Sequence, residues 1–287
     1  MMVNNSKSGR QMLAAASFIC VLSVFSGVMS AQTPLDNAWT ILQAGTGNKS
    51  IDERVITMRV LQLIPGNARA VSMAQKGLQD KEAQVRVAAA ASLGAMEDKS
   101  AVPQLAAMMK SEPEGEVVMA LAKALIQLGD QRGYEVFYAV VTGTRKSGES
   151  LIGGEEKELT QLLKNPHEME KIAFEQGIGF VPFGGVSMEA FQIIHANKEQ
   201  APIMKASSIK ALAKDPDPRT VKALLAALSD KNWLVRSAAY DALARRGDAA
   251  VLPEISTGLT DEKAEVKFTA AAAVAHLSRI SNKAAGE

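Results

Sequence analysis

Cysteine is almost absent from this chain, and its only thiol is that of Cys20. This residue lies inside an apolar run that extends from Met12 to Met29 near the N-terminus. Once that run is removed, the remaining chain has no cysteine at all. It can then form neither a disulfide bond nor a thiolate metal site, even in an oxidising compartment.

Motifs that carry catalysis or metal binding are missing as well. No serine stands in a G-x-S-x-G context, and Asn48 occupies the position where a phosphate-binding loop ending in Lys49-Ser50 needs glycine. Ser50 and Glu53 are instead typical of a helix capping box. The histidines, none of which shows the spacing of metal ligands, are His167, His195 and His276. We therefore expect no enzymatic activity, no metal and no cofactor.

One sign of charge does not dominate, and aromatic residues make up only 5% of the chain. There are 32 basic and 31 acidic residues, with no run of like charges. A nucleic-acid groove needs clustered Lys and Arg together with stacking aromatics. We therefore expect neither nucleic acid nor a membrane surface as a partner, apart from the N-terminal segment.

Residues 1–31 have the layout of a secretory signal peptide. Lys7 and Arg10 precede the apolar run, and small residues end it at Ser30 and Ala31, after either of which cleavage fits. We expect export of the mature chain to the periplasm or the extracellular space. The alternative is a membrane anchor that is not cleaved, because about 18 apolar residues can just span a bilayer.

What the chain does contain is a repeat with a period of 31 or 32 residues. Segments 80–109 and 230–259 align without a gap, so that Val85-Arg86 falls on Val235-Arg236. Within a copy, apolar residues follow helical spacing, stop at a turn such as Gly247-Asp248, and then resume. Each unit is therefore expected to be two helices that bury their apolar stripes by stacking on neighbouring units. The sequence predicts an all-α solenoid.

The pattern D-x-x-x-x-V-R-x-x-A-A-x-x-L, with an aspartate thirteen residues after the valine, resembles HEAT repeats. It is most similar to the short subtype also found in phycobilisome lyase-like proteins. The matching residues in the two best copies are Asp80, Val85, Arg86, Ala88, Ala89, Leu93, Asp98, Asp230, Val235, Arg236, Ala238, Ala239, Leu243 and Asp248. The resemblance implies a HEAT-like α-solenoid, and the family serves mostly as a protein-binding scaffold.

We divide the chain into a signal peptide at 1–31, a HEAT-like repeat domain at 32–280 and a short tail at 281–287. Clear repeats lie at about 80–111, 112–142, 201–229, 230–260 and 261–280, and a loop insertion with a degenerate repeat fills 143–200.

Two kinds of surface are expected on this array. The repeated basic residues Arg86, Lys205, Arg236 and Lys267 should pair with the repeated acids of adjacent units in a ladder along the stack. Second helices usually line the concave face of such solenoids. Their groove-side positions are small or uncharged at one level, as at Ala107 and Ala226, so we expect a chemically bland groove there.

A glycine-rich loop at 177–185 supplies the candidate binding residues. It is the one place where bulky apolar residues gather in a segment that cannot be helical, and insertions in solenoids often map to the binding face. Each side chain left in water would forgo about 1.5–3 kcal/mol, so these groups either contact a partner or fold back over the gap made by the insertion. The candidates are Ile178, Phe180, Val181, Phe183 and, in the following expected helix, Phe191.

The sequence therefore predicts an exported, non-enzymatic scaffold that presents its repeat surface to another protein. Two other interpretations stay open: a lyase-like or other enzyme with its site near residues 177–185, and a structural component of an envelope assembly. The last unit has a first helix but too little chain for a second. Phe268, Val274 and Leu277 are therefore expected at an open C-terminal end, which would pack on a second copy or dock a partner.

Overall fold

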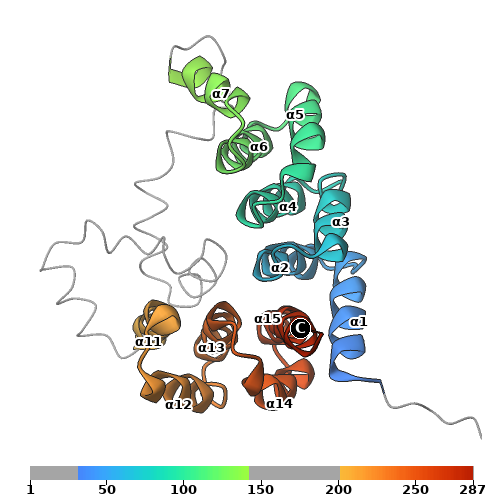
Figure 1. The fold of residues 1–287 in the computed structure, drawn as a ribbon. Coiled ribbons are helices and arrows are strands. Elements are labelled where there is room, and N and C mark those ends of the chain that lie inside the picture. The colour runs from blue at the N-terminus through green and yellow to red at the C-terminus, as the bar shows by residue number, and fades with distance from the viewer. Residues whose placement is uncertain (1–31, 142–200, 287) are drawn as a thin grey trace, which may run out of the picture. The chain divides into compact units, whose positions relative to one another are not determined.

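A computed structural model describes residues 32–141 and 201–286 of the chain. Within these two segments the chain forms twelve α-helices, several short 3-10 turns and no strand. The all-α solenoid predicted from the repeat is thereby confirmed. The helices lie in two layers, one built from the first helix of each unit and the other from the second (Figure 1).

The first-helix layer runs from the C-terminal segment of the chain into the N-terminal segment. In the order in which each helix packs on the next, it consists of α11 (Ala201–Ala211), α13 (Trp233–Arg246), α15 (Ala264–Ala285), α2 (Ile51–Val60), α4 (Ala83–Ala95) and α6 (Gly115–Gln127). The second-helix layer consists of α12 (Pro218–Ala227), α14 (Leu252–Ile255) with the 3-10 turn Ser256–Thr260, α1 (Pro34–Thr46), α3 (Ala68–Gly77), α5 (Val102–Ser111) and α7 (Arg132–Val141).

The two aspartates of the unit at 80–111 begin its two halves. Asp80 Oδ1 accepts a hydrogen bond from the backbone N–H of Glu82 at 3.0 Å, just before α4. Asp98 Oδ1 accepts one from Ser100 N–H at 2.9 Å, where the chain turns toward α5. A carboxylate at such a position satisfies N–H groups that have no partner inside the helix. The repeat acids are therefore structural, which explains their regular spacing.

The predicted ladder of ion pairs is present along the first helices. In a typical case, Arg86 Nε and Nη2 donate to the carboxylate of Glu112 in the next unit, while Nη1 donates to the carbonyls of Asp80 and Lys81. Each guanidinium thus links the turn of its own unit to the acid of the next unit. The pairs are Arg54–Asp80 at 2.8 Å, Arg86–Glu112 at 2.7 Å, Arg236–Asp261 at 2.8 Å and Lys205–Asp230.

Two details of the ladder differ from the prediction. Arg54 belongs to it, although its unit is not among the clear repeats predicted from the sequence. Lys267 does not follow the arginine pattern, and its Nζ lies 5.8 Å from the centroid of the Phe268 ring. The turn before α2 carries Asn48 in place of the repeat acid. Asn48 keeps the local role of that acid, since its Oδ1 accepts a hydrogen bond from Ser50 N–H at 2.8 Å.

The capping box predicted at the start of α2 is half right. Ser50 Oγ accepts a hydrogen bond from Glu53 N–H at 3.3 Å, as expected. The Glu53 carboxylate, however, accepts from the side-chain amide of Asn48 at 2.8 Å rather than from Ser50 N–H. Asn48 therefore takes the place of the reciprocal partner.

The units do not stack in chain order. Helix α15, the last of the chain, packs on α1 and α2, the first two (Figure 1). Helix α1 lies in the second-helix layer and occupies the place of the second helix that the last unit lacks. Here we call this joint between α15, α1 and α2 the seam.

Close packing at the seam depends on a glycine. A Cβ on Gly45 would lie 2.2 Å from Thr57 Oγ1 and 2.5 Å from Cε1 of Phe268, so α1 can approach α2 and α15 this closely only without one. On its other side, Trp39 of α1 lies under the guanidinium of Arg69 in α3, 4.5 Å from the ring centroid, a favourable cation–π distance.

The prediction of an open C-terminal end is wrong, because α1 packs on α15. Phe268, Val274 and Leu277 are buried, with exposed fractions of 3%, 0% and 0%. The N-terminal helix α1 covers the end of the array that the C-terminal sequence leaves uncovered. The expectation that a second copy or a partner docks at that end therefore loses the exposed apolar face on which it rested.

Candidate functional site

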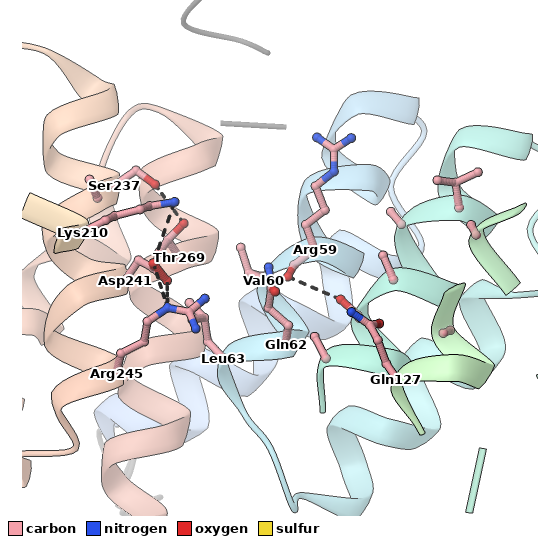
Figure 2. A pocket seen from close by; sticks show the side chains of 18 of the residues that line it. Arg59, Val60, Gln62, Leu63, Gln127, Lys210, Ser237, Asp241, Arg245 and Thr269 are labelled. Carbon is pink, nitrogen blue, oxygen red and sulfur yellow. Dashed lines mark hydrogen bonds and ion pairs between the residues drawn. The ribbon is translucent and has the colours of Figure 1, made fainter. Parts of the chain in front are cut away.

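A groove of about 650 Å³ lies on the first-helix layer (Figure 2). All of its lining residues come from α2 and the 3-10 turn after it, α4, α6, α11, α13 and α15. We had expected the second helices to line such a surface, and that prediction is wrong. The first helices carry the small residues that permit close approach, and their layer borders the groove, whereas the bulkier apolar residues of the second helices pack elsewhere.

The floor of the groove is apolar and made largely of small side chains. Its alanines are Ala88, Ala91, Ala95, Ala120, Ala124 and Ala238, and they are joined by Leu63, Val87 and Leu234. Ala91 and Ala95 are exposed to solvent. A floor of this kind allows another polypeptide to come close to the helix backbones.

The charged residues of the groove are mostly cations. Four basic side chains line it, Arg59, Lys123, Lys210 and Arg245, against a single acid, Asp241. The lining therefore carries a formal charge of +3. The chain without residues 1–31 loses Lys7 and Arg10, which leaves 30 basic against 31 acidic residues, so the positive charge of the groove is local.

One wall of the groove holds an ionic cluster of Lys210, Asp241 and Arg245 (Figure 2). Arg245 Nε donates to the two carboxylate oxygens of Asp241 at 2.8 and 3.1 Å. Lys210 Nζ lies 3.9 Å from Asp241 Oδ2. Burial lowers the pKa of Lys210 below its ordinary value, and the carboxylate of Asp241 opposes that effect. One carboxylate thus serves two cations, and the cluster has a net positive charge.

Beside this cluster, hydroxyl groups connect α13 to α15. The Oγ atoms of Ser237 and Thr269 lie 3.1 Å apart, both residues being buried. Thr269 also donates to the carbonyl of Glu265 at 2.6 Å. These hydroxyls are engaged in packing the layer, so we assign them a structural role.

The candidate residues from the glycine-rich loop cannot be placed. Ile178, Phe180, Val181, Phe183 and Phe191 all lie outside the described residues. The loop insertion and the degenerate repeat expected at 143–200 lie outside them as well. Among residues 32–141 and 201–286 there is no group of His, Cys, Asp and Glu that could hold a metal ion. No helix in that part of the chain is long and apolar enough to cross a membrane.

Comparison with known families agrees with the fold. The sequence model described as HEAT repeats matches residues 41–140 and 191–275, together more than half of the chain. The chain belongs to the HEAT-repeat family. No curated protein matches it. A HEAT array is a protein-interaction scaffold, since stacked units offer an extended binding surface rather than one enclosed pocket.

The groove residues that sequence reasoning missed share positions in the HEAT units. Five of them lie at one repeat position, eleven residues after the acid that begins a unit or after the residue equivalent to it. They are Arg59, Ala91, Lys123, Lys210 and Asp241. Arg245 lies four residues, about one helical turn, further along. We call these six residues the groove row. The signal was present in the repeat alignment of the first helices, where the only repeated basic residues considered were Arg86, Lys205, Arg236 and Lys267.

Proposed function

We propose that this protein is an exported, non-enzymatic scaffold that binds another protein in the groove of its first-helix layer. The observation that carries the proposal is the groove itself. It spans first helices from both described segments of the chain. Several of its side chains remain exposed, among them Ala91, Ala95 and Lys123. Stacking does not require these side chains, so they are available to a partner.

A protein partner suits the chemistry of this surface. The small apolar floor can pack against apolar side chains, and the basic rim can pair with polar or acidic ones, which is the usual division of an interface into core and rim. Membership of the HEAT family supports the same class of function.

Site-specific photo-crosslinking in the producing cells tests the location of the interface. A photoreactive residue, p-benzoylphenylalanine, replaces Ala91 in the groove or Ala226 on α12, both of which are exposed alanines. We expect a defined crosslinked protein with the residue at Ala91 and none with the residue at Ala226. A partner captured only at Ala226 would place the interface on the second-helix layer and overturn the proposal.

Export is proposed from residues 1–31, whose basic start, apolar run and small final residues fit a signal peptide. The intact mass of the protein recovered from the producing cells should correspond to a chain that starts just after Ser30 or Ala31. Recovery of the full-length chain in the membrane fraction would instead support an uncleaved anchor.

A further inference from the structure

We infer that the partner segment in the groove is acidic, and that the groove row recognises it. This inference rests on the proposed function and specifies its ligand.

The cations recur because the repeat places them on one face. Arg59, Lys123 and Lys210 are equivalent residues of three HEAT units, so each first helix directs that position into the same groove. A cation at this position is not needed for stacking, because Ala91 occupies it in one unit. The row therefore places positive charge where the fold itself does not require it.

The single acid that lines the groove, Asp241, cannot balance the formal charge of its four cations. The acid in the row, Asp241, is 10% exposed and already shared between Lys210 and Arg245, whose side chains are 29% and 47% exposed. The ladder arginines are different, since Arg236 is only 13% exposed and its guanidinium binds a carboxylate and two carbonyls. Arg245 and Lys123 keep surface with which an incoming carboxylate can pair.

The distance between the cations of the groove row sets the distance expected between the acidic residues of the bound peptide. Neighbouring packed helices lie about 8–10 Å apart, so Arg59 on α2 and Lys123 on α6, with α4 between them, are separated by about 16–20 Å. On a helical peptide, residues three turns apart are separated by about 16 Å. An amphipathic helix with acidic residues three turns apart and small apolar residues between them would match both the charges and the alanine floor.

Nucleic acid fits this groove less well. Single strands are held by cations together with aromatic side chains that stack on the bases. The residues lining the groove include no aromatic side chain among those the structure describes. The apolar floor is instead suited to protein side chains.

Fluorescence anisotropy with three labelled probes tests the inference on the purified protein. The first is an alanine- and leucine-rich helical peptide with glutamates three turns apart on one face. The second has lysines in place of those glutamates, and the third is oligo-dT. We expect binding of the glutamate peptide alone, weakened by added salt because the contact is ionic.

A matched pair of variants assigns the binding to the groove. Lys123→Glu reverses an exposed charge of the groove row, and Lys110→Glu makes the same change at an exposed lysine of α5, outside the groove. We expect Lys123→Glu to weaken binding of the glutamate peptide about tenfold. Lys110→Glu should leave binding unchanged, and both variants should keep the wild-type circular dichroism spectrum.

Three results would overturn the inference. They are no binding of the glutamate peptide, equal weakening by both variants, and binding of oligo-dT that Lys123→Glu abolishes, which would indicate a nucleic-acid ligand. If a protein is captured at Ala91 but the glutamate peptide does not bind, the acidic ligand is wrong and the scaffold function stands. Capture at Ala226 alone contradicts the proposed function itself.

Discussion

Two arginines of the same helix have different surroundings. Arg236 and Arg245 both lie on α13 and both bind an aspartate. Arg236 is 13% exposed and connects its own turn to Asp261 of the next unit, whereas Arg245 is 47% exposed and pairs within its own helix. The side-chain type is therefore a poor guide to role. The repeat position decides whether a cation belongs to the ladder or to the groove.

We expect the largest loss of stability from Arg236→Ala, which tests the role of the ladder arginine in this comparison. It leaves the carboxylate of Asp261 without its ion-pair partner and removes the donor to two carbonyls. Removing one member of a fully buried pair costs about 3–5 kcal/mol. This pair is part-buried, so urea denaturation should show a loss of about 2–4 kcal/mol. Arg219→Ala is the control, because this arginine also pairs with an aspartate but its side chain is 91% exposed. A wild-type melting temperature for Arg236→Ala would contradict the structural role of the ladder.

The second prediction concerns the seam, where Lys267 and Asn48 stand in place of the usual arginine and acid. If close packing replaces the ladder there, Gly45→Ala should destabilise the protein by about 1–3 kcal/mol, the usual cost of overpacking. Helix propensity alone would predict a gain of about 1 kcal/mol. Gly47→Ala is the control, because a Cβ at Gly47 meets no atom within 4 Å. Stabilisation by Gly45→Ala in thermal denaturation would show that α1 does not pack against Phe268 as described.

A smaller loss of stability is expected at low pH, and it arises from the aspartates of the ladder. Burial would raise the pKa of Asp80, Asp230 and Asp261, but hydrogen bonds from Arg54, Lys205 and Arg236 respectively, with further ones from backbone N–H groups, hold it below the ordinary 3.8. A depressed pKa in the folded state gives stability that is fully present above the unfolded pKa and is lost as pH falls through the folded one.

The urea concentration at the midpoint of unfolding should therefore not change with pH well above pH 4. It should fall below pH 4, because these carboxyls become protonated. Asp80→Asn should lower stability at neutral pH and make the fall shallower, since one titrating group is gone. An Asp80→Asn variant with an unchanged acid dependence would show that this carboxylate does not contribute to it.

The smallest effect on stability is expected for the groove. Lys123→Ala removes an exposed side chain, so the free energy of unfolding should change by about 0.5 kcal/mol or less. Binding of the glutamate peptide should weaken all the same, which separates this residue from Arg236. A loss of several kcal/mol in urea denaturation would erase the distinction between groove and ladder.

The parts of the structure that depend on local pattern could be predicted from the sequence. The spacing of Val235 to Leu243 gave the helix, and the repeated acids next to Arg86 and Arg236 gave the ladder. The seam could not be found by looking only at successive repeats, because it joins the two ends of the chain. A signal did exist: Gly45 and Asn48 fall one period before Gly77 and Asp80. The groove was assigned to the wrong layer because the pattern within one helix shows which of its faces is buried, but not where the stacked units leave an open surface.

The seam also has a consequence for the order in which the molecule can be completed. Helix α1 is synthesised well before α15, the helix on which it packs. More than two hundred residues separate Gly45 from Phe268. Contacts between such distant residues have a large loop-closure entropy to overcome, and they slow folding relative to contacts between successive units. The units of a chain-order solenoid can pack one after another as they are synthesised, whereas the seam of this protein cannot form until α15 has been synthesised. Joining α15 to α1 through a short linker and opening the chain between α7 and α11 would make every contact of the stack local, and that rearranged protein should fold faster.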